Sequence, residues 1–241
     1  MQFDLIMGKQ TIRELLLHAP HRLLMVYVAM HKEKDDLLSL LQEKNISLVY
    51  VSKEKLSSMV GSDSHQSFVA KIKKRKIWDL RSFLEEQQCS FLLLLDTITD
   101  PQNFGAILRS AECFGVSGVI TSKNRGSPMT PTVAKASAGA SELLSLIEVS
   151  NLAESLRVLQ KAGFAIIVAD ASSSARENLA SFSFPEKSVL VMGSEEKGVQ
   201  PLICKMADHL VYIPMKGKIA SLNVAQATSV FLFARSKTIL H

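Results

Sequence analysis

The chain has 241 residues, of which 47% are hydrophobic, so it can bury one large core or two modest ones. No apolar run reaches the roughly 18 to 20 residues that cross a membrane, and the first residues lack the pattern of a signal peptide. The few cysteines, Cys89, Cys113 and Cys204, are widely spaced, and no metal-ligand spacing links them to histidine. We therefore expect a cytoplasmic protein with reduced cysteines and neither a membrane segment nor a metal site.

The net charge of +5 is distributed unevenly along the chain. Residues 1–76 carry 13 Lys and Arg against 8 Asp and Glu, whereas residues 77–241 carry 15 of each kind. The excess includes the basic run over residues 71–76. A basic appendage on a neutral core suits a polyanion such as nucleic acid, and a solvated linker is the alternative that charge alone leaves open.

Residues 1–76 alternate short helical and strand patterns. Apolar spacing predicts helices over 8–18, 35–43 and 53–59, and strands over 23–29, 47–51 and 68–72. Residues 77–90 are expected to be a linker with one or two helical turns. Trp78, the only tryptophan, is expected to pin this linker to a domain.

From residue 91 the pattern alternates longer strands and helices. It predicts strands over 91–95, 116–120, 146–149, 164–169, 189–192 and 209–213, and helices over 104–114, 132–138, 152–162 and 224–233. Asn103 is a suitable N-cap for the first of these helices. Because the strands are continuous apolar runs, we expect a doubly wound parallel α/β sheet that binds its ligand at the carboxyl edge.

The glycines near this edge bear on the cofactor. No strand is followed by the G-x-G-x-x-G pattern of a dinucleotide site. Gly193 and Gly198 have the outer spacing of a P-loop, but Val199 and Gln200 replace the lysine and hydroxyl residue that would hold phosphate and magnesium. A pocket of neutral backbone groups suits an adenosine-bearing ligand without phosphates, such as S-adenosylmethionine.

Residues 95–115, 189–198 and 213–225 resemble, in this order, the three motifs of the SpoU/TrmH-type RNA ribose methyltransferases of the SPOUT superfamily. The resemblance is strongest to the branch that methylates a guanosine ribose of bacterial 23S ribosomal RNA. It implies a trefoil-knotted, parallel-sheet methyltransferase domain over residues 91–241. A small L30e-like α/β RNA-binding domain over residues 1–76 and the linker 77–90 would precede it.

The resemblance also implies catalytic roles for Asn103, Arg109, Glu195, Ser221 and Asn223. Since arginine stays protonated, we expect Arg109 to clamp the phosphate beside the target ribose and to stabilise developing negative charge, rather than to act as the base. Glu195 is expected to organise the loop and Asn103. Ser221 and Asn223 would cap the final helix, contact the cofactor or ribose, or do both.

S-adenosylmethionine is the implied cofactor, bound in a bent form largely by main-chain groups. The residues expected to surround it are Met192, Gly193, Gly198, Ile213, Pro214 and Leu222. For the apolar members of this set, plain core packing is the alternative. No metal is needed, because methyl transfer from a sulfonium requires placement and charge complementarity.

Lys9 and His65 match positions that the family uses on the RNA side, and Arg125 is expected to bind RNA phosphates together with the basic groups of residues 1–76. The family usually has glycine after its His-Gln pair, but this chain has Ser67, so the geometry of that loop and the RNA role of His65 are in question. Taken alone, His65 is more typical of a structural loop histidine.

The sequence therefore predicts an S-adenosylmethionine-dependent methyltransferase that modifies a ribose 2′-hydroxyl of ribosomal RNA. The alternatives are a transfer RNA ribose as the target and a non-catalytic RNA-binding module of the same fold. The resemblance further implies a homodimer through the knotted domain, with each active site completed by the partner.

Overall fold

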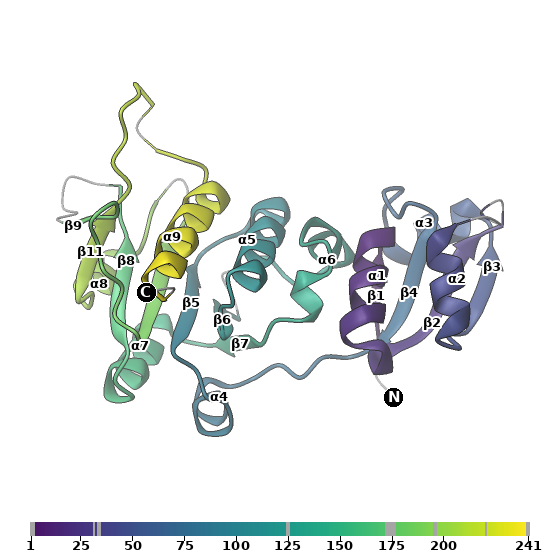
Figure 1. The fold of residues 1–241 in the computed structure, drawn as a ribbon, viewed down its shortest axis with the longest axis horizontal. Helices are drawn as coiled ribbons and strands as arrows, with labels where there is room; N and C mark the ends of the chain where they lie inside the picture. Colours follow the sequence, from purple (N-terminus) through teal and green to yellow (C-terminus); the bar gives the residue numbers. More distant parts are fainter. Residues whose placement is uncertain are drawn as a thin grey trace. The chain divides into compact units, whose positions relative to one another are not determined.

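The computed structural model describes residues 3–30, 32, 35–123, 126–171, 177–194, 197–219 and 221–239. These residues form two compact units (Figure 1). The first unit comprises Met1–Arg75 and Pro128–Leu143, and the second comprises Lys76–Ser127 and Leu144–His241. The segment Pro128–Leu143 therefore packs with the first unit although it lies in the middle of the chain.

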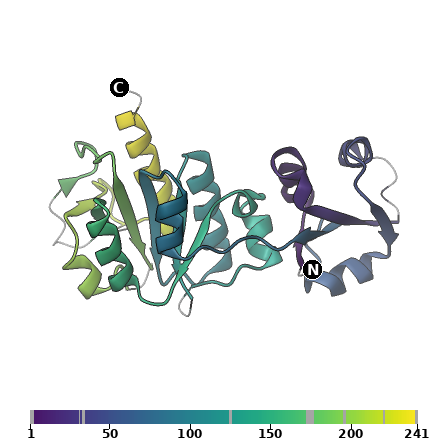
Figure 2. The same ribbon diagram turned by 90° about the horizontal axis from the view of Figure 1, so that it is seen from below.

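The first unit is built on a four-stranded mixed sheet with the order β1-β4-β2-β3. Its strands are β1 (Phe3–Met7), β2 (Leu23–Ala29), β3 (Leu48–Val51) and β4 (Phe68–Lys73). Strand β4 is antiparallel to β1 and β2, whereas β2 and β3 are parallel. Helices α1 (Lys9–His18) and α2 (Asp36–Glu43) cover one face and α3 (Lys53–Val60) lies on the other (Figure 2).

The segment 128–143 completes the core of this unit. It forms α6 (Pro131–Ala136) and the 3₁₀ turn η2 (Ala140–Glu142). A first 3₁₀ turn, η1 (Pro20–Arg22), precedes β2 in the same unit. Ala134 is buried in the cluster beneath α1 and α2, and its carbonyl accepts a hydrogen bond from Thr11 Oγ1 at 3.3 Å. Gly139 has φ of +92°, and a Cβ there would lie 3.1 Å from the Thr11 carbonyl oxygen, so close packing and backbone conformation both favour glycine.

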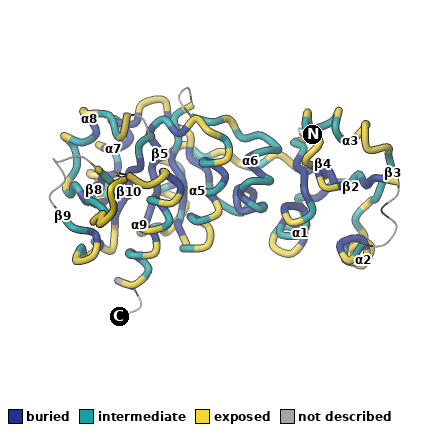
Figure 3. The backbone as a smooth tube through the Cα atoms, turned by 90° about the horizontal axis from the view of Figure 1, so that it is seen from above, coloured by how far each residue is buried: buried dark blue, intermediate teal, exposed yellow. Residues whose placement is uncertain are grey.

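The second unit contains a seven-stranded sheet with the order β7-β6-β5-β10-β8-β11-β9, in which all paired strands are parallel. Its strands are β5 (Phe91–Asp96), β6 (Gly118–Ser122), β7 (Leu146–Val149), β8 (Ala165–Ala169), β9 (Glu177–Asn178), β10 (Ser188–Gly193) and β11 (His209–Tyr212). Every residue of β5 is buried, as expected of a central strand covered on both faces (Figure 3).

Helices cover both faces of this sheet (Figures 1 and 2). Helices α4 (Leu80–Glu86) and α7 (Leu152–Lys161) pack on one face, where Leu152, Leu156 and Leu159 recur at helical spacing in the buried cluster. Helices α5 (Pro101–Cys113) and α9 (Val224–Ile239) pack together on the other. Within the described ranges, every helix is too short or too polar to span a bilayer.

Most of the predicted elements are confirmed, including the parallel α/β sheet. Trp78 pins the linker as expected: its backbone pairs with β7 through Leu146 and Glu148, and its ring packs on the buried cluster. The three cysteines are free, also as expected. Three elements were not predicted from the sequence: β1, the two-residue β9 and the short α8 (Pro201–Cys204).

The predicted N-cap of α5 is wrong. Asp100 is the cap, because its carboxylate accepts a hydrogen bond from the Asn103 backbone N–H at 2.7 Å. Pro101 then occupies the first helical position, where its missing N–H costs nothing. Asn103 consequently lies inside the first turn, and its side chain is available for another role.

Candidate functional site

A cavity of about 380 Å³ lies at the carboxyl edge of the parallel sheet. Its walls come from the loop after β5, the start of α5, the loop after β10 and the start of α9. The lining residues are Thr97, Ile98, Thr99, Asp100, Asn103, Ser194, Lys197 and Val224. Segments that are distant in sequence meet here because the carboxyl ends of parallel strands share one edge.

Asn103 and Asn223 connect two of these walls. The Asn223 amide nitrogen donates to Asn103 Oδ1 at 3.0 Å, with the amide orientations assigned from the hydrogen-bond network. Asn223 Oδ1 accepts from the backbone N–H groups of Ala225 at 2.9 Å and Gln226 at 3.4 Å. Asn223 therefore caps α9, as expected, and also orients Asn103, while its contact with the cofactor or the ribose remains a prediction.

Asp96 fastens the loop after β10 to the end of β5. Its side chain is buried, and its carboxylate accepts from Gln200 N at 2.9 Å, Gln200 Nε2 at 2.7 Å and Thr97 Oγ1 at 2.9 Å. These three hydrogen bonds satisfy a side chain whose burial without partners would be costly. Asp96 and Gln200 were not predicted from the sequence. The one available signal was that Asp96 is the first polar residue after the apolar run of β5.

Thr97 adds local strain at the same edge. Its φ is +63°, which is unusual for a β-branched residue because the left-handed region crowds its Cβ. The residue lines the cavity, and its hydroxyl is held by Asp96. Strained backbone of this kind is retained where the surrounding structure fixes it, often at functional sites.

Gly193 and Gly198 approach each other too closely for any side chain. A Cβ on Gly193 would lie 2.1 Å from the carbonyl carbon of Gly198. Gly198 has φ of +62°, and its N–H donates to the Ser194 carbonyl at 2.9 Å. The two glycines thus form a tight backbone turn beside the cavity. Glu195, expected to organise this loop, lies outside the described residues.

Arg109 lies in the middle of α5 and is exposed to solvent. It does not line the cavity. It lies six positions after Asn103, so helical geometry places it about 9 Å further along α5 and about a third of a turn around the helix axis. The next residue, Ser110, faces α9 instead of solvent. Its hydroxyl lies 2.8 Å from that of Ser229 and links α5 to α9.

None of the expected cofactor residues lines the cavity, although Gly193 and Leu222 are close in sequence to lining residues. Met192 is buried at the end of β10, and Ile213 is half-buried just after β11. Pro214, Ser221 and Leu222 are exposed in the long loop between β11 and α9. Their contacts with a cofactor remain a prediction.

In the first unit, Lys9 and Gln66 are in contact. The Lys9 backbone N–H donates to Gln66 Oε1 at 3.2 Å. The Lys9 ammonium lies 2.9 Å from Asp35 and 2.5 Å from Asp36, and hydrogen bonds to these carboxylates raise its pKa. In this arrangement its charge is locally neutralised, and its RNA contact remains a prediction.

His65 has a structural role in this unit. Its side chain is buried, Nδ1 accepts from the Ser67 backbone N–H at 3.1 Å, and Nε2 lies 3.1 Å from Ser57 Oγ. Burial lowers the pKa of His65. Gln66 and Ser67 have φ of +54° and +72°, so the loop keeps a left-handed conformation despite the serine. Arg125 lies outside the described residues.

The described residues contain no group of three or more His, Cys, Asp or Glu side chains arranged to hold a metal ion. The polar side chains that line the cavity are one carboxylate (Asp100), one amide (Asn103), three hydroxyls and one lysine. Such a set suits an organic ligand, since hard cations prefer clusters of carboxylates.

The fold and site define a class: a parallel α/β domain with a ligand cavity at the carboxyl edge of its sheet, joined to a small α/β unit. The model of the SpoU rRNA Methylase family matches residues 90–233, and the model described as RNA 2′-O ribose methyltransferase substrate binding matches residues 5–78. The chain belongs to the SpoU rRNA Methylase family.

Similar proteins support this assignment. The chain is 35% identical over 236 residues to the 23S rRNA (guanosine-2′-O-)-methyltransferase RlmB of Shewanella oneidensis, with 95% of each chain covered. It is 36% identical over 238 residues to the RlmB of Yersinia pestis, again over 95% of each. The crystal structure of the SpoU methyltransferase AviRb from Streptomyces viridochromogenes in complex with AdoMet has the same fold, with a TM-score of 0.80, 22% identity, and coverage of 99% of this chain and 91% of that one.

Proposed function

We propose that this protein transfers a methyl group from S-adenosylmethionine to the 2′-hydroxyl of a guanosine ribose in 23S ribosomal RNA. The observation that carries this proposal is the hydrogen bond between Asn223 and Asn103 beside the cavity. It joins the first and third family motifs at the sheet edge where open α/β folds bind ligands. A transfer RNA target is less well supported, because relatives that match 95% of the chain are named for 23S ribosomal RNA.

The residues at the sheet edge fit the cofactor. The close approach of Gly193 to Gly198 leaves a cradle of bare backbone that a Cβ would fill. The cavity volume is within the range of small-molecule sites. We assign the cofactor to main-chain groups of Gly193, Ile213 and Leu222, with Met192, Gly198 and Pro214 nearby.

When bound, the cofactor supplies an electrophilic methyl group on a sulfonium. The ribose 2′-oxygen would accept this methyl group, leaving the bonding electron pair on sulfur, and would lose its proton to solvent. Asn103, held by Asn223, orients the ribose. Arg109 binds the neighbouring phosphate and stabilises charge that develops on the oxygen, while Glu195 and Ser221 organise the two loops.

The charge distribution supports a division of labour along the chain. Residues 1–76 form the RNA-binding domain, 77–90 the linker, and 91–241 the methyltransferase domain with its C-terminal segment knotted. Lys9 and Arg125 contact phosphates, and His65 holds the loop whose Gln66 side chain contacts Lys9. Their contribution is expected to weaken with salt, as phosphate contacts do.

A second copy of the chain is the proposed partner, and the cytoplasm the proposed location. The helix pair α5–α9 leaves apolar side chains in solvent, with Val230 39% exposed and Phe233 50% exposed. Phe233 also packs edge-on against Phe114 of the α5 end. Covering this face with the same face of a second copy would bury it and bring each Arg109 near the partner's site.

The first experiment measures tritiated methyl transfer from S-adenosylmethionine to unmodified 23S RNA and, separately, to bulk transfer RNA. Label confined to alkali-resistant dinucleotides of 23S RNA is the expected result. Label in transfer RNA alone would keep the chemistry and replace the substrate. RNA binding without any transfer would instead support the non-catalytic module.

Arg109→Ala is expected to lower methyl transfer by at least about 100-fold, because the phosphate clamp and charge stabilisation are lost. Binding of S-adenosylmethionine should be unchanged, and calorimetry measures it. Arg81→Ala removes an equally exposed arginine of the second unit and serves as the control. Full activity of the Arg109 variant would refute its assigned role.

A further inference from the structure

The sheet of the first unit has one face that is only partly covered. Helix α3 packs through Leu56 on Met7, Ala29 and Val69, at one end of this face. The other end is without a helix in the described part of the unit. We name it the open sheet face; it consists of Phe3, Leu5, Met25, Lys71 and Lys73, of which Leu5 borders α3 and packs against its buried cluster.

Strand registers place these five side chains together. In the β1–β4 pair, Phe3 lies opposite Lys73 and Leu5 opposite Lys71; in the β2–β4 pair, Met25 lies opposite Lys71. Alternation along each strand then directs all five to the same side of the sheet. The acidic residue of β1, Asp4, alternates to the opposite side, so this face carries no carboxylate among the described strand residues.

The open sheet face combines an aromatic ring with positive charge. Phe3 is 49% exposed, and the Lys71 ammonium lies 3.9 Å from the centroid of its ring. Lys73 is also exposed, and neither lysine forms an ion pair with a described residue. Exposure of a large aromatic side chain to water is unfavourable. A cation placed over an aromatic ring is an arrangement found in nucleic-acid binding sites.

We propose that the open sheet face binds an unpaired segment of the RNA substrate, with a base stacked on Phe3 and phosphates held by Lys71 and Lys73. This inference rests on the proposed function, since it names the form of RNA that the first unit receives. Unpaired RNA fits because its bases expose faces for stacking, whereas a duplex hides them. The strand-wide face also spans several side chains, as stacking platforms on sheets do.

A protein partner is the competing occupant, and a second copy of the chain is its simplest form. An apolar protein surface would leave Lys71 and Lys73 without countercharge, whereas RNA phosphates supply it. Charge complementarity therefore favours RNA.

The test uses the full chain and a fluorescein-labelled oligouridine of about 12 nucleotides, with an RNA duplex of equal length as competitor. Phe3→Leu keeps an apolar side chain but removes the ring, and is expected to weaken binding about tenfold. Phe3→Trp should bind within about twofold of the unmodified chain because stacking persists. Lys71→Ala/Lys73→Ala should reduce the slope of log affinity against log salt by about 1.4.

Lys53→Ala/Lys55→Ala is the matched control, since it removes two exposed lysines from α3 of the same unit. Thermal melting of each variant confirms folding. Three outcomes would overturn the inference. Phe3→Leu could bind oligouridine as tightly as the unmodified chain, the two lysine double variants could lose the same affinity, or the duplex could compete as well as unlabelled oligouridine. A change of oligomeric state in Phe3→Leu would assign the face to a second copy instead.

Methyl transfer to 23S RNA separates this inference from the proposed function. Phe3→Leu should raise KM at least about fivefold and leave kcat unchanged, because stacking binds ground state and transition state alike. If the unmodified chain binds oligouridine through Phe3 but methylates no RNA, the proposed function fails and the binding face stands. If it methylates 23S RNA with equal KM in Phe3→Leu, the face fails and the function stands.

Discussion

At the scale of single residues, the cavity edge is built by backbone conformation as much as by side-chain chemistry. Gly193 is required because Gly198 occupies the space of its Cβ, and Thr97 is held at positive φ. The motifs predicted Gly193, Asn103 and Asn223. They did not predict Thr97, because residue type does not encode an unfavourable φ that tertiary contacts impose.

Gly193→Ala is expected to weaken S-adenosylmethionine binding at least about tenfold, since its Cβ would overlap the backbone of Gly198 and force the turn apart. Isothermal titration calorimetry measures the affinity. Gly126→Ala is the control, because a Cβ there meets its nearest atom at an ordinary 3.5 Å. Undiminished binding by the Gly193 variant would show that the close approach of Gly193 to Gly198 is not required for cofactor binding.

His65 is expected to make the first unit less stable as pH falls. Its folded-state pKa lies below the ordinary value, so the unfolded chain takes up the proton first. The stabilisation is therefore complete above about pH 6.5 and is lost as pH falls below it, by at most about 1.4 kcal/mol per pH unit. Protonation at Nδ1 would also break the bond from Ser67.

His65→Asn tests this pH dependence, because an asparagine oxygen accepts the same backbone N–H two residues on without titrating. Hydrogen exchange of residues 60–70 at pH 7.5 and 5.5 is the measurement. The unmodified chain should lose protection at the lower pH, and the variant should not. Parallel losses in both proteins would exclude His65 as the cause.

At the scale of elements, periodicity located the helices and strands because apolar spacing reports which face is buried. Strand β1 was missed because its pairing with β4 joins residues far apart in sequence, and a five-residue segment carries little periodicity of its own. Strand β9 and α8 are shorter still. The N-cap of α5 was misplaced because Asp100 and Asn103 are both good caps and only the hydrogen bond decides between them.

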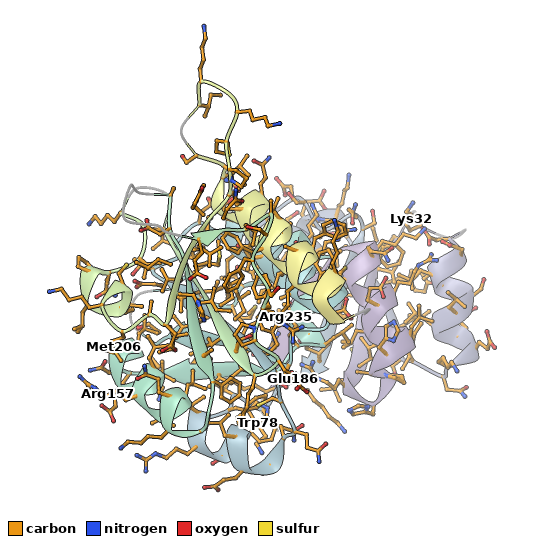
Figure 4. All side chains as sticks on the ribbon, turned by 60° about the vertical axis from the view of Figure 1, so that its left-hand side comes forward. Lys32, Trp78, Arg157, Glu186, Met206 and Arg235 are labelled. Carbon is orange, nitrogen blue, oxygen red and sulfur yellow. The ribbon has the colours of Figure 1, made fainter. Side chains whose placement is uncertain are left out.

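Helix α9 carries a buried arginine that the sequence does not explain. Arg235 lies between α9 and the sheet (Figure 4), 3.9 Å over the ring of Phe91. It is 6% exposed, its Nε has no hydrogen-bond partner, and burial lowers its pKa. The alkyl part of its side chain packs favourably in the core, whereas burial of its charged guanidinium is unfavourable.

Arg235→Met is expected to leave the free energy of unfolding unchanged or to raise it by about 1 kcal/mol, because methionine fills the space without a buried charge. Arg235→Ala should lower it by about 2 kcal/mol, since a cavity opens beside Phe91. Urea titration followed by Trp78 fluorescence measures both. A large loss in the methionine variant would show that the guanidinium itself stabilises α9.

At the scale of the whole molecule, a buried charge cluster holds the two parts of the first unit together. Glu142 is almost fully buried and pairs with Arg22, at 2.9 Å, and with Arg75. Arg22 also donates to the Glu142 carbonyl at 2.8 Å, and Arg75 to the Ser141 carbonyl. The sequence did not predict this cluster, because the residues are 67 or more positions apart.

Glu142→Ala is expected to destabilise the first unit by about 3 to 5 kcal/mol, because two buried guanidinium groups lose their countercharge. Hydrogen exchange should rise in both 3–30 and 128–143 and stay unchanged in 152–169 of the second unit. Glu142→Gln keeps the side-chain shape and hydrogen-bonding oxygen, so its effect should be smaller. Unchanged exchange in 128–143 would contradict a clamping role.

The inclusion of Pro128–Leu143 in the first unit has a consequence for how the chain is made. Residues 1–75 are synthesised well before Glu142. Until then they lack Ala134, which packs beneath α1 and α2, and the Glu142 carboxylate, which pairs with Arg22 and Arg75. Completion of the amino-terminal unit is therefore delayed until the first strands of the following sheet, β5 and β6, have already been synthesised. The first unit therefore begins the chain but cannot be completed before part of the second unit has been synthesised.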